Sequence, residues 1–149
     1  MIKVYGFPHS RSLRITWLLE ELGLEYDYQL INLSKGDNRA VEFLAINPAG
    51  KVPVIEDDGL VIFESAAIVS HLSDKYGDAQ IIPAPGTDKD YLMGAAFSAV
   101  DILVAHTLNW GVKFEQPIPQ ANLNAYRERV MARPARAKAL ARETQSLEG

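Results

Sequence analysis

The stretch 47–68, which reads NPAGKVPVIEDDGLVIFESAAI, constrains the fold of this chain more than any other. Two short apolar runs, 54–55 and 60–63, lie on either side of an Asp-Asp-Gly turn. Apolar runs joined by Asp-Gly predict the two strands of a β-hairpin. Ser65 follows the second run and precedes a helical apolar pattern, which predicts a helix N-cap. The chain is therefore expected to pass from a hairpin directly into a helix.

The chemistry expected at this corner follows from the backbone groups that it exposes. Val52-Pro53 stands at a strand start, where proline is tolerated because the ladder does not need its N–H. A cis peptide bond there would turn the N–H and C=O of Val52 outward, toward an extended peptide. The first turn of the following helix offers free N–H groups, which together with the Ser65 hydroxyl suit a carboxylate. Glu64 suits an ammonium group, so we expect a small peptide ligand that carries both an amine and a carboxylate.

The segments on either side of this corner alternate between strand and helix patterns. In order, we expect a strand (2–5), a helix (11–22), a strand (26–30), a weakly helical segment (35–46), the hairpin and a helix (65–76). Gly23 and Gly77 stand where the first and last of these helices should end. The opening strand, helix and strand predict a right-handed parallel unit. The first half of the chain is therefore α/β.

The second half of the chain shows only helical patterns. Ser98-Ala-Val-Asp101 has the spacing of a capping box, with Asp in place of Glu or Gln. The helix expected over 98–110 is apolar nearly all round, and such a helix is normally buried on every face. Further helices are expected over 122–132 and 135–143, followed by a disordered tail.

At this point the chain resembles a known family. The residues VPVIEDDGLVIFESAAIVSHL are similar to the glutathione-binding segment of the glutathione S-transferases, with Val-Pro and Glu-Ser in the family's order. The resemblance is to bacterial serine-type members of the beta or theta kind and covers nearly the whole chain. It implies an α/β thioredoxin-like glutathione-binding domain over 1–77, a linker over 78–90 and a shortened all-helical domain over 91–149. It also implies reduced glutathione as co-substrate.

The resemblance implies a catalytic serine in the first loop. Ser10 stands four residues before Arg14, where serine-type members carry the hydroxyl that donates a hydrogen bond to the glutathione thiolate. A free thiol has a pKa of about 8.5, so such a donor raises the fraction of thiolate at neutral pH. Ser12 is the second candidate, and a simple helix cap is the alternative role for Ser10. Tyr5 is expected to be a core residue of its strand.

The resemblance also implies a set of glutathione-binding residues. Lys51 would pair with the glycine carboxylate of glutathione, unless it is a solvated lysine, and Arg11 and Arg39 are weaker candidates for that pairing. The full expected binding set is Lys51, Val52, Pro53, Glu64 and Ser65.

One departure from the family pattern affects the second substrate. Two long helices of the family have no counterpart here, because PAPGT (83–87) runs almost directly into DKDYLMG (88–94). In the family, the first of them helps to form the dimer interface and one wall of the electrophile site. The helix over 98–110 therefore lacks neighbours, and a large apolar patch is uncommon on a soluble monomer. We expect association through this helix, as a homodimer or an intertwined oligomer.

Composition excludes several classes of function. The chain has no cysteine, which excludes disulfides, cysteine–zinc sites and Cys-x-x-Cys redox chemistry. Its net charge of −4 gives no general attraction to nucleic acid or to an anionic membrane. It contains no apolar run long enough to span a bilayer and no signal-peptide pattern at its start. From these two absences we expect a cytoplasmic protein. The three histidines have no spacing typical of a metal site, so we expect no metal.

Two functions fit these observations. The first is a glutathione transferase that stabilises the glutathione thiolate and lets it attack a small hydrophobic electrophile or a peroxide. The alternative is a catalytically weak glutathione-binding or interaction module that has lost the electrophile site. A third function, dithiol redox exchange, is permitted by the fold but disfavoured by the absence of cysteine.

Overall fold

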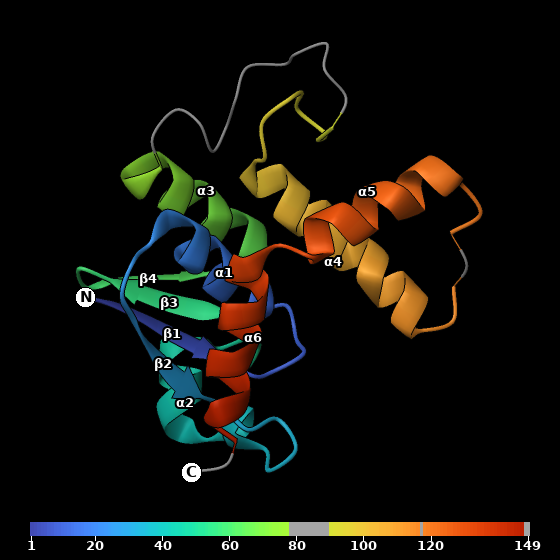
Figure 1. Ribbon diagram of the computed structural model, residues 1–149. Helices are drawn as coiled ribbons and strands as arrows, with labels where there is room; N and C mark the ends of the chain where they lie inside the picture. The colour runs from blue at the N-terminus through green and yellow to red at the C-terminus, as the bar shows by residue number, and fades with distance from the viewer. Residues whose placement is uncertain (78–89, 117, 148–149) are drawn as a thin grey trace. The chain divides into compact units, whose positions relative to one another are not determined.

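The computed structural model describes residues 1–77, 90–116 and 118–147. Its elements, labelled in Figure 1, are β1 (Ile2–Gly6), α1 (Leu13–Leu22), β2 (Tyr26–Leu30), the short 3-10 helix η1 (Asp37–Arg39), α2 (Val41–Ile46), β3 (Val54–Asp57), β4 (Leu60–Phe63), α3 (Ser65–Tyr76), α4 (Ala99–Lys113), α5 (Ala121–Met131) and α6 (Pro134–Gln145). They form two compact units, one of Met1–His71 with Ala135–Gly149 and one of Leu72–Pro134.

The first unit is built on a four-stranded sheet in the order β2-β1-β3-β4. β1 pairs in parallel with β2, from Ile2 opposite Tyr26 to Gly6 opposite Leu30, and pairs antiparallel with β3. β3 and β4 form the expected hairpin, whose two turn residues have φ angles of 50° and 83° at Asp58-Gly59. Two positive φ angles are what a tight turn of type I′ requires. The α/β thioredoxin-like fold expected for this part of the chain is therefore confirmed.

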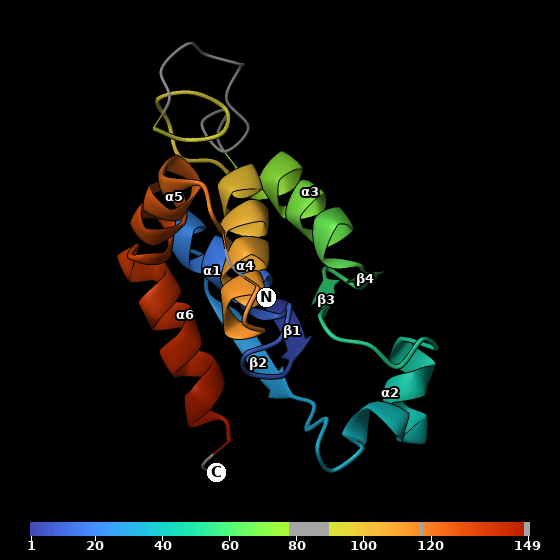
Figure 2. The ribbon, with the colours of Figure 1, turned by 90° about the vertical axis from the view of Figure 1, so that its right-hand side faces the viewer.

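Helices cover both sides of this sheet. Figure 2 shows α1 and α6 on one side of the β1–β2 pair and α2 on the other. α1 ends at Gly23, whose φ of 66° is the left-handed conformation expected of a helix C′ residue. On the α2 side, the Tyr5 and Phe43 rings lie with their centroids 6.3 Å apart. On the α1 side, the fully buried side chains include Ile15, Trp17, Leu18 and Leu19.

The last helix, α6, packs with the sheet-containing unit. Its Glu143 carboxylate accepts a hydrogen bond of 2.9 Å from the Thr16 hydroxyl on α1. Its Arg142 Nη2 donates to the Tyr26 carbonyl at 2.6 Å, and the guanidinium lies 4.0 Å from the Tyr26 ring centroid. The first compact unit is thus made of two separate stretches of sequence, and the domain bounds expected at 77 and 91 stay predictions. The linker expected over 78–90 lies outside the described residues except for its last position.

The end of α6 corrects one expectation. A disordered tail was expected from Thr144, yet α6 continues through Thr144 and ends at Gln145. The Thr144 hydroxyl donates back to the Leu140 carbonyl at 2.9 Å, so this side chain satisfies its polar group within the helix.

The second unit contains α4 and α5, held together by the carboxylate of Asp101. This carboxylate accepts hydrogen bonds from the Ser98 N–H at 2.8 Å and the Ser98 hydroxyl at 2.7 Å. It also accepts from the Leu92 N–H at 3.0 Å and from the Tyr126 hydroxyl of α5 at 2.8 Å. The capping box expected at Ser98–Asp101 is present. It fixes the start of α4 and also ties that start to α5.

The composition of α4 suggested a helix buried on every face, but the structure shows that this helix is only partly buried. It extends to Lys113, past the end expected at Trp110, and its buried residues all lie between Ala99 and His106. Beyond them, Val112 is 43% exposed and the adjoining Phe114 is 64% exposed. The C-terminal part of α4 therefore presents apolar surface to solvent.

Candidate functional site

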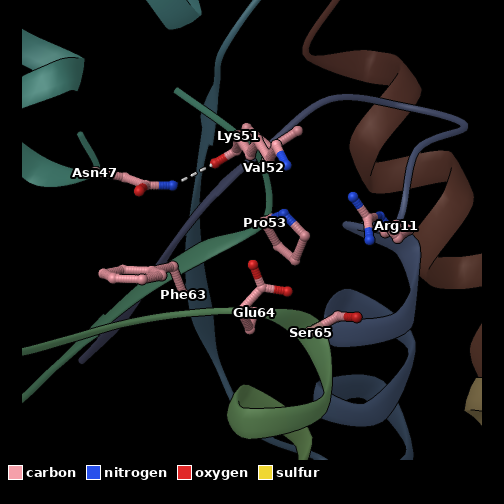
Figure 3. Close-up of a pocket in the computed structure, with 8 residues that line it drawn as sticks. All are labelled: Arg11, Asn47, Lys51, Val52, Pro53, Phe63, Glu64 and Ser65. Atoms are coloured by element: carbon pink, nitrogen blue, oxygen red, sulfur yellow. Dashed lines mark hydrogen bonds between the residues drawn. The ribbon is translucent and has the colours of Figure 1, made fainter. Parts of the chain in front are cut away.

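A pocket opens beside the Val52-Pro53 bend in the first unit, as the close-up in Figure 3 shows. Its lining consists of Arg11, Asn47, Lys51, Val52, Pro53, Phe63, Glu64 and Ser65. All five residues expected to bind glutathione therefore line one pocket. Arg11, a weaker candidate, lines it too, whereas Ser10, Ser12 and Arg39 are not part of the lining.

The loop that leads into the bend is held by asparagine side chains. The Val52-Pro53 peptide bond is cis. The Asn47 side-chain amide donates to the Lys51 carbonyl at 2.8 Å, and its Oδ1 accepts from the Ala49 N–H at 3.1 Å. Asn47 is only 1% exposed, so it acts as an internal brace of the loop. Sequence reasoning missed this residue, although Asn before Pro is a common turn signal.

Gly50 in the same loop cannot be replaced without a clash. Its φ is 61°, and a Cβ built on it would lie 2.8 Å from the Asn38 carbonyl oxygen. The Asn38 side-chain amide donates to the Gly50 carbonyl at 2.9 Å, which brings the two backbones together. This close approach positions Lys51 and Val52 at the pocket.

The Glu64–Ser65 corner differs from the expected helix start. Glu64 has a φ of 73°, and its carbonyl accepts the first helical hydrogen bond, from the Ile68 N–H at 3.0 Å. Ser65 is therefore the first residue of α3, and the expected N-cap at Ser65 is wrong. The left-handed backbone at Glu64 is the cause, because it places Ser65 inside the helix. The Ser65 side chain still lies at the positive end of α3, where anions are stabilised.

Positive charge gathers at the Ser65 end of the pocket. Arg14 Nη1 donates to the Ser65 hydroxyl oxygen at 3.1 Å. Burial and then the nearby charge of Arg11 lower the pKa of Arg14, although a guanidinium stays protonated at neutral pH. In Figure 3, Arg11 and Ser65 lie on one side of the pocket and Asn47 on the other. Glu64 supplies the negative charge between them.

The two candidate catalytic serines form one small network before α1. The Ser10 hydroxyl donates to Ser12 Oγ at 2.8 Å and accepts from the Ser12 N–H at 3.1 Å. Ser12 Oγ also accepts from the Phe7 N–H at 3.2 Å. Ser12 is fully buried, whereas Ser10 is partly exposed. Of the two residues, only Ser10 is accessible to solvent.

Tyr5 and His71 each contact a carboxylate within the fold. The Tyr5 hydroxyl donates to Glu56 Oε2 at 3.3 Å, and burial, followed by the charge of Glu56, raises the pKa of Tyr5. His71 Nε2 lies 2.8 Å from Oδ2 of the buried Asp57, which links α3 to the end of β3. Over residues 1–77, 90–116 and 118–147, no group of three or more His, Cys, Asp or Glu could hold a metal ion. Within the same ranges, every helix is too short or too polar to cross a membrane.

The family models match nearly the whole chain. Residues 1–74 match the glutathione S-transferase N-terminal domain, and residues 70–134 match the glutathione S-transferase C-terminal domain. Together these matches cover residues 1–134, which leaves out only the C-terminal part of the first unit.

Individual relatives match a little over half of the chain. Glutathione S-transferase hmp2 of Hypomyces subiculosus is 40% identical over 84 residues, which cover 56% of this chain and 39% of that protein. A zeta-class glutathione S-transferase of Euphorbia esula is 43% identical over 84 residues, covering 56% and 37%. The matched part of the chain thus spans less than two fifths of the length of these curated relatives.

Solved structures share the fold over both units. A glutathione transferase from Methylococcus capsulatus str. Bath has a TM-score of 0.83 at 23% identity, covering 97% of this chain and 100% of that one. A glutathione transferase homolog from Sulfitobacter, solved with bound glutathione, has a TM-score of 0.81 at 16% identity, covering 95% and 98%. At these low identities, the structural similarity shows a common fold. Taken with the two family models, they establish that the chain belongs to the glutathione S-transferase family.

Proposed function

We propose that this chain binds reduced glutathione in the pocket beside Val52-Pro53. The observation that carries the proposal is the lining itself, which brings two cations and one carboxylate around the cis Val52-Pro53 bend. Glutathione carries two carboxylates and one ammonium group on a short peptide, so its charges complement this lining. The bound glutathione in the Sulfitobacter relative adds support, since that protein shares the fold.

Each part of glutathione has a suitable partner in the pocket. Ser65, the N-terminus of α3 and Arg11 suit the carboxylate of the γ-glutamyl residue. Glu64 suits its ammonium group. The backbone of Val52 suits the central cysteine, because an extended peptide pairs with exposed N–H and C=O groups. Lys51 suits the glycine carboxylate.

The catalytic part of the proposal assigns to Ser10 the stabilisation of the glutathione thiolate. The Ser10 hydroxyl would turn from Ser12 Oγ to the glutathione sulfur and donate a hydrogen bond to the thiolate. The thiolate would then attack a small hydrophobic electrophile, forming a carbon–sulfur bond as the leaving group departs, or would attack a peroxide oxygen, forming a sulfur–oxygen bond as the O–O bond breaks and the alkoxide leaves. Each unit by which the thiol pKa falls requires about 1.4 kcal/mol of preferential thiolate stabilisation.

A second function, glutathione binding without efficient turnover, is favoured by one observation. α3 ends at Tyr76 and α4 begins at Ala99, and this interval is too short for two further long helices. A family member without those helices lacks the wall that they give to the electrophile site. Turnover of a chloronitroaromatic substrate at saturating glutathione supports the transferase, and glutathione binding without turnover supports the binding module.

We also propose that the chain associates with a second copy through α4. At the end of this helix the Trp110 and Phe114 rings lie with their centroids 6.1 Å apart, and Val112 and Phe114 are 43% and 64% exposed. Exposed apolar surface of this kind favours burial between copies. Light scattering over a dilution series should give a dimer mass, and a monomer that binds no apolar dye at any concentration would contradict this.

Calorimetric titration with reduced glutathione tests the binding proposal. The wild-type chain should give a saturable heat with one site per chain. Glu64→Gln and Ser65→Ala should each weaken binding about five- to tenfold, the effect of removing one polar contact. The matched controls Glu42→Gln and Ser70→Ala change exposed side chains outside the pocket and should bind like the wild type. Absence of wild-type heat at millimolar glutathione would overturn the proposal.

A further inference from the structure

We propose that Arg14 is a positioning residue that aims the Ser65 hydroxyl proton at an anionic group in the pocket. In the proposed function this anion would be the γ-glutamyl carboxylate of glutathione. The part of the inference that concerns glutathione therefore rests on the proposed function. It begins with one contact, the hydrogen bond of 3.1 Å from Arg14 Nη1 to Ser65 Oγ. This contact joins α1 to the first residue of α3, across 51 positions of sequence.

The direction of this hydrogen bond decides what the Ser65 hydroxyl can do. A guanidinium only donates, so Ser65 Oγ must be the acceptor. A serine hydroxyl carries one proton that rotates to suit its partners. Because Arg14 donates to a lone pair of Ser65 Oγ, the hydroxyl proton of Ser65 points away from Arg14. No residue in the described ranges accepts this proton. Ser65 is 7% exposed and lines the pocket, so its proton is available to a ligand there.

Arg14 is itself well placed to hold this orientation. It lies in the first turn of α1, and its backbone N–H donates to the carbonyl of Arg11, in the turn before the helix, at 3.1 Å. Arg11 lines the pocket, whereas Arg14 contacts Ser65. An anion bound at Ser65 would thus gain from Arg11 directly and from Arg14 through a hydroxyl that Arg14 polarises. Hydrogen bonds that include a charged partner are roughly twice as strong as neutral ones.

A double-mutant cycle distinguishes this role from a merely structural one. Glutathione affinity is measured calorimetrically for the wild type, Arg14→Met, Ser65→Ala and the double variant. Arg14→Met should weaken binding about tenfold when Ser65 is present, and less than about twofold when Ser65 has been replaced. Arg14→Lys, which keeps a charged donor, should recover part of the loss. Lys35→Met, at an exposed loop position, is the matched control and should leave the affinity unchanged.

A ligand change gives a readout that folding does not affect. Glutathione with its γ-glutamyl α-carboxylate converted to an amide should bind the wild type weakly. Arg14→Met should weaken this analogue no further, because the anionic group is gone. Equal losses for glutathione and for the amide, or equal losses with and without Ser65, would show that Arg14 acts only through the fold and would overturn the inference.

A separate arm keeps this inference distinct from the glutathione proposal. Sulfate is titrated into isotopically labelled protein, and the backbone amide signal of Ser65 is followed by NMR. The wild type should show a saturable shift that Arg14→Met loses. If glutathione fails to bind but the sulfate shift depends on Arg14, only the glutathione proposal fails. A wild-type Ser65 signal that does not move, or that moves equally in Arg14→Met, would overturn the role given to Arg14.

Discussion

Thr16 and Glu143 are joined by a hydrogen bond of 2.9 Å between two buried side chains, although 127 positions separate them in sequence. The second oxygen of Glu143 has no hydrogen-bond partner within the described ranges. Burial raises the pKa of Glu143 to about 8, and the hydrogen bond from Thr16 opposes this only in part. Most copies of the folded protein therefore hold a neutral Glu143 at pH 7, between α6 and α1.

Replacing Glu143 should change how stability depends on pH. In the unfolded chain this carboxyl titrates near 4.5, whereas in the folded chain it titrates at about 8. The folded chain therefore holds an extra proton between these values, and stability falls as pH rises through this window, by about 1.4 kcal/mol per unit. The glutamine in Glu143→Gln is neutral at every pH. The free energy of unfolding of this variant, relative to that of the wild type, should therefore rise with pH and level off above about pH 8.

Denaturant unfolding followed by circular dichroism, from about pH 5 to pH 9, measures this difference. Glu128→Gln is the matched control, since Glu128 is exposed on α5 and should give a difference that does not vary with pH. A constant difference between Glu143→Gln and the wild type across this range would contradict a neutral buried carboxyl.

Gly6 should tolerate no side chain. A Cβ at this position would lie 2.8 Å from the Tyr28 hydroxyl oxygen and 2.9 Å from Ser12 Cβ, and both contacts are too close. We expect Gly6→Ala to destabilise the fold by about 1–3 kcal/mol through overpacking. Adding Tyr28→Phe should recover part of this loss, because it removes the atom nearest to the new methyl group.

The control for Gly6 is the same substitution on α4. At Gly111 the nearest atom to a new Cβ is 3.9 Å away, which is an ordinary contact. Gly111→Ala should therefore stabilise the chain by about 0.5–1 kcal/mol, since alanine favours helix. Equal effects of the two substitutions on the thermal midpoint would count against the close packing described at Gly6.

Asp101 should be the most sensitive position of the second unit. Its carboxylate accepts four hydrogen bonds, from Ser98 twice, from Leu92 and from Tyr126. Asp101→Ala would leave buried donors unsatisfied and should cost about 3 kcal/mol or more. Tyr126→Phe removes one partner and should cost about 1 kcal/mol, and almost nothing further once Asp101 has been replaced.

Chemical denaturation of the two single variants and the double variant measures these costs. Asp74→Ala, at an exposed position of α3, is the control. Additive losses for Asp101→Ala and Tyr126→Phe would show that the two side chains do not share one network.

Ser10→Ala should reduce turnover without a matching loss of glutathione affinity. The Ser10 hydroxyl is proposed to stabilise the thiolate, so its removal should return the pKa of bound glutathione toward the value of about 8.5 for a free thiol. The rate of conjugation to a chloronitroaromatic substrate should then fall at neutral pH and partly recover as pH rises. Ser12→Ala removes a buried acceptor of two hydrogen bonds and should mainly lower stability. Unchanged turnover in Ser10→Ala would discard the assignment.

Local signals in the sequence were sufficient for much of the fold. Asp58-Gly59 predicted the hairpin, and Gly23 predicted the end of α1, because each turn requires a backbone that few residues adopt. The five expected binding residues also proved to line one pocket, since they lie close together along the chain. Their individual roles toward a ligand stay predictions.

Other features depended on contacts that local patterns do not encode. The N-cap at Ser65 was wrong because Glu64, a residue with no special turn propensity, adopts a left-handed backbone. The placement of α6 depends on Thr16 and Glu143, whose pairing is set by tertiary packing. The same holds for the contact between Arg14 and Ser65.

The most direct test of the central claim is an NMR titration of labelled protein with reduced glutathione. If the pocket binds glutathione, the backbone amides of Val52, Glu64 and Ser65 should shift together with a single saturation curve. Ser70 and Glu42, which are exposed outside the pocket, should not follow them. Amides of the bend and of the α3 N-terminus that stay unchanged at millimolar glutathione, or a saturable shift confined to α4 and α5, would contradict the account.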